Sequence, residues 1–345
     1  MTWGLMAALL ICMTFCTLWG ARYDESKDTF LSLSDVSFLR GFWCIVVVLV
    51  HIPTLYVNKV QDMVGSFAYI GVTFFFMTSA YGLKYSVASK KGYLDRFWRN
   101  RLPKLLVPAL LANALQVSAS GALNGWNTIS IVSYLNINNW VKVLLCEYFV
   151  FWLVYAVLPR WIRGGYWQDA TICGFVLTCS LIDHFTPYKI TWSWEVEPFG
   201  FIYGLIVANH SEEVRSFLNK QWMKKCVVFL ILACTLGIVY LRYKPIPFWG
   251  NYLLKLILGF SITLFVFEVI AKLKVGNRVN GFLGSISYEV FLIHGATFRI
   301  LMLFDRNGDM NSGEFILLSI ILTIMLATLL KKISGYLAKE VKKYI

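Results

Sequence analysis

The chain has 345 residues, of which 58% are hydrophobic and only 15% are charged. Soluble globular proteins average about 45–50% apolar and about 25% charged residues, so this composition excludes an ordinary soluble domain. The formal net charge is +13, but the positive residues lie between long apolar runs. That pattern indicates membrane topology, and we expect no nucleic-acid partner.

Apolar segments of helix length follow one another along the whole chain and predict an all-α fold, a polytopic transmembrane helix bundle with about 10–11 spanning helices. Helices are favoured over a barrel because the strict alternation of a transmembrane strand is missing. The first segment lacks a positive region before it and a clear cleavage site, so a signal anchor or a first span is favoured over a signal peptide. The predicted segments are 3–20, 37–57, 67–87, 104–121, 140–162, 168–185, 197–209, 224–241, 250–271, 281–304 and 314–335.

Lysine and arginine gather on alternate connections and predict the orientation of the bundle. The densest cluster lies between Lys90 and Lys104. If the segments alternate across the membrane, the positive residues near 160–163, 215–225 and 272–278 and those in the C-terminal tail fall on the same side. We assign that side to the cytoplasm, since cytoplasmic connections carry the excess of Lys and Arg.

Arg40 and His51 flank an apolar run in the second segment. Eleven residues turn a helix by about 1100°, so the two side chains share one face, about 16 Å apart along the axis. Pro53 follows closely and is expected to loosen the helix there. An imidazole can accept a proton from a hydroxyl near neutral pH. A general base and a histidine bonded to a neighbouring helix for packing are equally compatible with this spacing.

The basic connection 84–104 has two interpretations. The first is topology together with binding of anionic lipid headgroups, which composition alone favours. The second is a phosphate site, because guanidinium groups grip phosphate through paired hydrogen bonds and Phe97 and Trp98 could stack on a ring.

Other polar groups interrupt apolar segments or gather at their ends. His294 lies within segment 281–304, and Glu147 lies within segment 140–162. Ionisable residues inside membrane helices are costly and by default mark function, although each of these could also serve a helix end. Trp192 and Trp194 are suited to stacking on a sugar, but interfacial tryptophan belts are the commoner cause of such clusters.

Taken in order, four motifs of the chain resemble the acyltransferase 3 family of membrane O-acyltransferases. They are Arg40-Gly41 with His51, Gly71-x-x-x-Phe75-Phe76, Asn100-Arg101-x-Pro103-Lys104 with Pro108, and Leu283-Gly284-x-Ile286-Ser287-Tyr288 with Phe291-Leu292-x-His294. The chain departs from the family pattern in having Lys104 for a second arginine, Ser37 for an acidic residue and Glu147-Tyr148 where Trp-Phe-Leu is common. The resemblance predicts an acyltransferase 3-like membrane domain over residues 31–345. Residues 1–30, an extra N-terminal transmembrane segment and loop, precede that domain and are a further departure from the family pattern.

The resemblance implies an enzyme of O-acetylation and polysaccharide modification in a bacterial cell (inner) membrane. It would move an acyl group, usually acetyl from cytoplasmic acetyl-CoA, to a hydroxyl of a carbohydrate or glycolipid, with membrane lipids around it and no metal. The catalytic residues implied are His51 as base or transient acyl carrier, Arg40 close to the thioester, and His294 as a supporting or acceptor-side group. The other roles implied are donor binding by Arg40, Arg96, Arg99, Arg101 and Lys104 and sugar binding by Trp192, Trp194 and Glu147.

The alternative is a transporter or flippase for a lipid-linked glycan, which would also need polar groups within the membrane and an aromatic mouth. The sequence shows no paired broken helices and no inverted repeat, so the enzyme is favoured. Release of free thiol from acetyl-CoA would distinguish the two.

Overall fold

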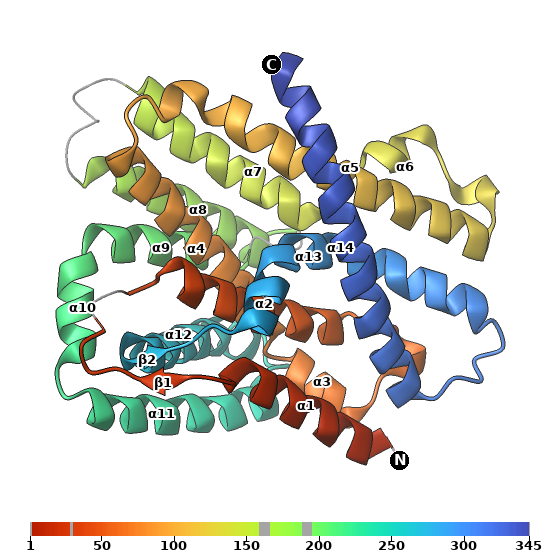
Figure 1. Ribbon diagram of the computed structural model, residues 1–345, viewed down its shortest axis with the longest axis horizontal. Helices are drawn as coiled ribbons and strands as arrows, with labels where there is room; N and C mark the ends of the chain where they lie inside the picture. The colour runs from red at the N-terminus through yellow and green to blue at the C-terminus, as the bar shows by residue number, and fades with distance from the viewer. Residues whose placement is uncertain (1, 28–29, 159–165, 188–194, 345) are drawn as a thin grey trace.

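A computed structural model describes residues 2–27, 30–158, 166–187 and 195–344, and nearly all of them are helical (Figure 1). The predicted all-α, polytopic architecture is therefore confirmed. The helices are α1 (Thr2–Leu18), α2 (Leu33–Val50), α3 (Lys59–Gly65), α4 (Ala68–Ser89), α5 (Phe97–Asn124), α6 (Ile131–Leu135), α7 (Asn139–Trp152), α8 (Trp167–Phe185), α9 (Phe199–Asn209), α10 (Ser211–Asn219), α11 (Trp222–Tyr243), α12 (Lys255–Lys272), α13 (Arg278–Phe304) and α14 (Ser312–Tyr344).

Each apolar segment predicted from the sequence forms a helix. Within the described residues, 8 helical stretches are long and apolar enough to cross a membrane. The other predicted segments correspond to α1, α8 and the short α9. The sequence did not indicate α3, α6 or α10, which are short helices between the longer ones. The chain is an integral, multi-pass membrane protein.

Two parallel helices, α2 and α13, lie side by side at the centre of the bundle (Figure 1). They approach closely because glycines face the partner backbone, Gly41 in the middle of α2 and Gly284 in the second turn of α13. A Cβ at Gly284 would collide with the carbonyl group of Ser37, and a Cβ at Gly41 would lie 3.1 Å from the Asn280 carbonyl oxygen. Small residues allow helix backbones to approach in lipid, where van der Waals contact drives association.

A second close crossing fixes the short helix α9 on α4. Gly200 and Gly204 lie one turn apart, and a Cβ at either would collide with a carbonyl of α4, that of Thr73 or that of Met77. This is the small-xxx-small pattern of membrane helix pairs. An apolar helix of only 11 residues is thereby held within the bundle.

The N-terminal segment is tied to the ends of α2, α12 and α13. Its two-residue strand β1 (Arg22–Tyr23) pairs antiparallel with β2 (Leu273–Lys274). The buried Lys27 ammonium donates to Asp35 of α2 at 2.8 Å. The side-chain amide of Asn277 donates to the Cys16 carbonyl in the last turn of α1 and to the Trp19 carbonyl just after that helix. These bonds satisfy main-chain carbonyl oxygens that have no donor within the helix at its C-terminal end.

Two predicted boundaries are wrong. The basic connection 84–104 was expected to precede the next helix, but α5 already begins at Phe97 and carries Arg99, Arg101 and Lys104 in its first turns.

Segment 37–57 was expected to run past His51, but α2 covers Leu33–Val50. Pro53 has no N–H for the Leu49 carbonyl, and the buried Gln61 amide of α3 donates to that carbonyl instead. The helix therefore ends at His51, and the Leu49 carbonyl that has no donor within the helix receives its hydrogen bond from α3.

The α2–α13 crossing makes a first prediction. Gly284→Ala should lower the free energy of unfolding by about 1–3 kcal/mol, since the new methyl forces the two backbones apart. Gly281→Ala is the matched control, because a Cβ there meets no atom within 4 Å, and it should be neutral or slightly stabilising. Thermal unfolding of the detergent-solubilised protein measures both. Equal unfolding temperatures for the two variants would show that the crossing tolerates a methyl group.

Candidate functional site

His51 is the C-cap residue of α2, and its imidazole hydrogen-bonds a carbonyl oxygen in the last turn of that helix. Its Nδ1 lies 2.8 Å from the Val47 carbonyl oxygen, while its backbone N–H donates to the Val48 carbonyl. A carbonyl oxygen can only accept, so Nδ1 carries the proton and Nε2 keeps a free lone pair. The side chain is exposed, and it is therefore accessible to a second molecule.

His294 of α13 lies against His51, with ring centroids 4.7 Å apart and planes inclined at 46°. It repeats the same local arrangement, since its Nδ1 lies 3.2 Å from the Val290 carbonyl oxygen. Its Nε2 is likewise left with a lone pair. In contrast to His51 it is buried, at 8% exposure, and it packs on Phe298. The structure thus brings together two residues that the sequence placed 243 positions apart.

The two histidines line a cavity of about 720 Å³. Pockets for small ligands usually measure about 300–1,000 Å³, so this chamber has room for a sugar unit. Its wall combines apolar side chains with polar groups from several helices. The polar lining residues are His51, Asp62, Ser66, Tyr69, Gln116, Asn138, Trp140, Glu197, Tyr240, Lys244, Lys255, His294 and Arg299.

An ion pair between Lys255 and Glu197 forms one side of the chamber. The ammonium lies 2.7 Å from the carboxylate, with both side chains largely buried. It also lies 4.9 Å from the centre of the Tyr69 ring, and the Tyr69 hydroxyl donates to the Lys255 carbonyl at 2.9 Å. These contacts join α4, α12 and the segment before α9 around one charge pair.

Arg40 does not line the chamber. Its guanidinium donates to the Thr78 hydroxyl at 3.1 and 2.7 Å and lies 5.3 Å from the centre of the Phe75 ring. Arg40 also interacts electrostatically with Arg101 and Tyr148. Arg40 and His51 thus lie apart along α2, as their spacing predicts, and Arg40 belongs to an arginine cluster with Arg101.

Arg101 completes this arginine cluster. It donates to the Tyr93 hydroxyl at 3.1 and 2.8 Å, and its guanidinium lies 5.8 Å from the centre of the Tyr148 ring. Of the basic residues predicted to bind a donor, Arg96, Arg99 and Lys104 are exposed and Arg101 is half-buried. The arginine cluster therefore has two inward-facing guanidinium groups and an exposed basic rim.

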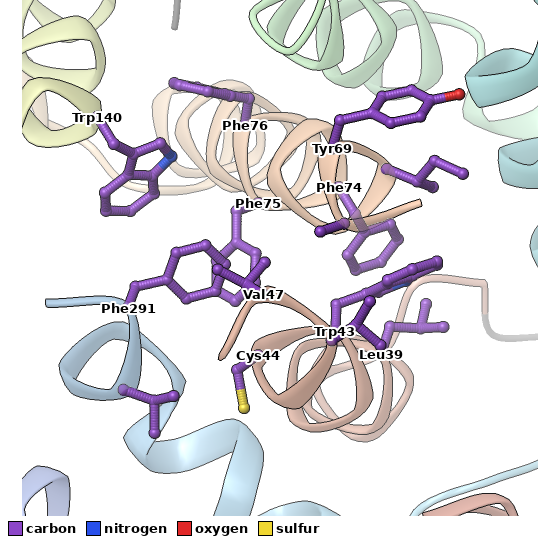
Figure 2. Close-up of a cluster of buried hydrophobic side chains, with 14 of the residues drawn as sticks. Leu39, Trp43, Cys44, Val47, Tyr69, Phe74, Phe75, Phe76, Trp140 and Phe291 are labelled. Atoms are coloured by element: carbon purple, nitrogen blue, oxygen red, sulfur yellow. The ribbon is translucent and has the colours of Figure 1, made fainter. Parts of the chain in front are cut away.

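Three aromatic side chains, Phe75, Phe291 and Trp140, connect the wall of the chamber to Arg40, and we call them the aromatic layer. Figure 2 shows them on α4, α13 and α7. Phe75 meets Phe291 with ring centroids 4.3 Å apart, and Phe291 stacks on Trp140 at 5.4 Å. Trp140 and Phe291 line the chamber, whereas Phe75 contacts Arg40. The Phe75 and Phe291 rings therefore lie between Arg40 and the chamber.

Three predicted sugar-binding residues have different outcomes. Trp192 and Trp194 lie outside the described residues. Glu147 is completely buried beside Tyr148 and does not line the chamber. Within the described part of the chain, neither of its carboxyl oxygens has a hydrogen-bond partner. Its position therefore gives no support for sugar binding from this chamber.

Sequence reasoning missed several lining residues. Arg299, Lys255 and Gln116 each lie within an apolar segment, and the cost of such groups in lipid is a signal that could have found them. Lys244 and Asn138 lie at segment ends, where polar residues are common, so nothing in the sequence distinguishes them.

Comparison with known proteins identifies one family. A family model described as an acyltransferase domain matches residues 33–332, which is nearly the whole chain. No curated protein and no solved structure matches it.

The ion pair of the chamber wall makes a second prediction. Lys255→Met should lower the free energy of unfolding by about 2 kcal/mol, because it leaves the Glu197 carboxylate largely buried without its partner. The double variant Lys255→Met with Glu197→Gln should recover most of that loss. Chemical unfolding in detergent measures both. A double variant as unstable as the single one would show that packing, rather than charge pairing, holds this wall.

Proposed function

Since the chain belongs to the acyltransferase 3 family and is thus a membrane acyltransferase, we propose that it moves an acyl group, acetyl in the first instance, from acyl-CoA to a hydroxyl of a carbohydrate or lipid-linked glycan. The observation that carries this proposal is the exposed His51 imidazole, which faces a sugar-sized chamber with its Nε2 lone pair free. A base in that position is what attack by a hydroxyl requires.

In this mechanism the acceptor hydroxyl lies against His51 Nε2. The imidazole takes the hydroxyl proton as the oxygen attacks the thioester carbonyl, the C–S bond breaks, and the CoA sulfur leaves with the proton that His51 returns. The product is an ester and free CoA. Transient acylation of His51 followed by transfer to the hydroxyl gives the same balance. His294 keeps the His51 ring oriented through their contact at 4.7 Å.

The acyl-CoA donor is proposed to enter from the side of the basic residues, across the aromatic layer from the chamber. The pyrophosphate and 3′-phosphate of CoA suit the exposed Arg96, Arg99 and Lys104, while Arg101 and Arg40 lie deeper in the same direction. Guanidinium groups bind phosphate oxygens through paired, charge-assisted hydrogen bonds. The basic end would face the cytoplasm of a bacterial cell with an inner membrane, where acyl-CoA is made.

Donor and acceptor would then meet across the aromatic layer. Only the slim acyl and pantetheine end of the donor has to cross it, since Phe75 already contacts Arg40 and Phe291 already lines the chamber. Rotation of these rings would admit the chain of the donor and exclude its nucleotide. The layer would also keep water from the thioester when no acceptor is bound.

His51 provides the test of the proposed chemistry. His51→Ala should lower acceptor-dependent release of thiol from acetyl-CoA by at least about 100-fold, because a positioned base contributes that much or more. Expression should stay as in the unaltered protein, whereas thermal unfolding should shift to a lower temperature because the variant also loses the bond to the Val47 carbonyl. Activity is therefore compared per amount of folded protein. His210→Ala is the matched control, as this histidine lies near a surface carboxylate of α10 and away from the chamber. Activity retained by His51→Ala would remove this residue from the mechanism, and a transporter would release no thiol in either protein.

Arg101 tests the path of the donor. Arg101→Ala should weaken binding of acetyl-CoA about tenfold, the loss expected for one charge-assisted contact to phosphate. Equilibrium binding to the purified protein measures this directly. Tyr93→Phe serves as a control, since it removes the hydroxyl that Arg101 holds without removing the charge, and it should cost less. Unchanged binding in Arg101→Ala would return the basic connection to a purely topological role.

A further inference from the structure

We propose that Arg299 binds an acidic group of the acceptor, a carboxylate or a phosphate, so that the chamber selects an anionic glycan. The inference rests on the acyl-transfer function proposed above, and it concerns the acceptor side of the same site. The sequence did not single out this residue, and the family motifs described above do not contain it.

The guanidinium of Arg299 is held beside the histidine pair. Arg299 lies five residues after His294 on α13, and its Nη1 donates to the Gly295 carbonyl at 3.0 Å. Gly295 has no side chain there, and the space is used by Gln116, whose Oε1 lies 2.8 Å from the place that a Cβ would occupy. Arg299 Nη1 lies 3.5 Å from the same point. The amide and the guanidinium therefore both border Gly295, one residue after His294, and both line the chamber that His51 lines.

The charges of the chamber leave Arg299 without a counterion. Lys255 is paired with Glu197 at 2.7 Å, and Lys244 donates to Ser66 and lies 3.9 Å from Asp62. In the described ranges, no carboxylate lies within 4.0 Å of the Arg299 guanidinium. With neutral histidines, the lining residues thus carry one uncompensated positive charge. An anion is the ligand that such a wall attracts most strongly.

Binding to a lipid headgroup is the competing explanation, because arginines near helix ends often extend toward the interface. The Arg299 side chain points away from the end of its helix, not toward it. Its bond to the Gly295 carbonyl turns the guanidinium back along α13, away from the end at Phe304 and toward His294. A side chain that served the interface would extend past the helix end. This one lines the chamber, and several of its N–H groups remain available.

The test is binding without any acyl donor, so that it does not depend on catalysis. The purified full-length protein in uncharged detergent is dialysed to equilibrium against glucose, glucuronic acid and glucose 1-phosphate. At least one of the acidic sugars should bind about tenfold more tightly than glucose, the difference expected from one charge-assisted contact. Glucuronic acid and glucose 1-phosphate distinguish a carboxylate from a phosphate as the recognised group.

Variants assign the preference to Arg299. Arg299→Gln should reduce the preference to less than about twofold, and Arg299→Lys should retain part of it, because it keeps the charge without the planar fork. Arg306→Gln is the matched control. It removes an exposed arginine from the connection that follows the same helix, and it should leave the preference intact.

The outcomes separate this inference from the proposed chemistry. The inference is overturned if the three sugars bind equally, if Arg299→Gln keeps the preference, if Arg306→Gln loses it equally, or if the preference appears only when anionic lipid is added. His51→Ala should keep the preference for the acidic sugar while losing acyl transfer. A protein that prefers acidic sugars but shows no loss of thiol release in His51→Ala would retain the Arg299 site and refute the role of His51.

Discussion

The contact between α2 and α13 at Gly41 and Gly284 determines the geometry of the candidate site. Ten residues separate Gly41 from His51, and ten separate Gly284 from His294. Both stretches rise by about 15 Å, so two parallel helices that touch at the glycines bring the imidazoles to the same level. The ring separation of 4.7 Å follows from that register. A pair of small residues about 15 Å away along the two helices thus positions two imidazoles side by side.

The same end of α2 shows how a membrane protein exposes a base without leaving backbone groups unsatisfied. Each open carbonyl within lipid costs several kcal/mol, so a helix cannot simply stop there. Pro53 ends the helix, Gln61 from α3 takes up the Leu49 carbonyl, and His51 itself takes up the Val47 carbonyl. The hydrogen bond from His51 Nδ1 to the Val47 carbonyl also sets the tautomer of His51, so its Nε2 keeps a free lone pair. The structural and chemical roles of His51 are therefore two results of one arrangement.

Much of the fold could be predicted because span assignment depends on composition over about 20 residues, which needs no knowledge of neighbours. The two histidines were also identifiable, since ionisable groups are costly in lipid. What the sequence could not show was which of them meet. Arg40 and His51 share a helix face, but the axial distance of about 16 Å keeps them apart, and each finds its partners on other helices. Arg299, Gln116 and Lys255 come from three helices, and only the tertiary packing brings them to one wall.

The aromatic layer accounts for the distance between the two polar regions. A membrane enzyme that takes a charged donor from one side and a sugar from the other must not become a channel for ions or water. Phe75, Phe291 and Trp140 lie between the two polar regions with ring centroids 4.3 to 6.3 Å apart, and apolar rings oppose the passage of hydrated ions. In the proposed reaction, a thioester on a slim, uncharged arm would displace such rings, whereas the phosphates of the donor would stay with the arginines. The separation of arginines from histidines would then let one bundle take both proposed substrates while the membrane stays closed.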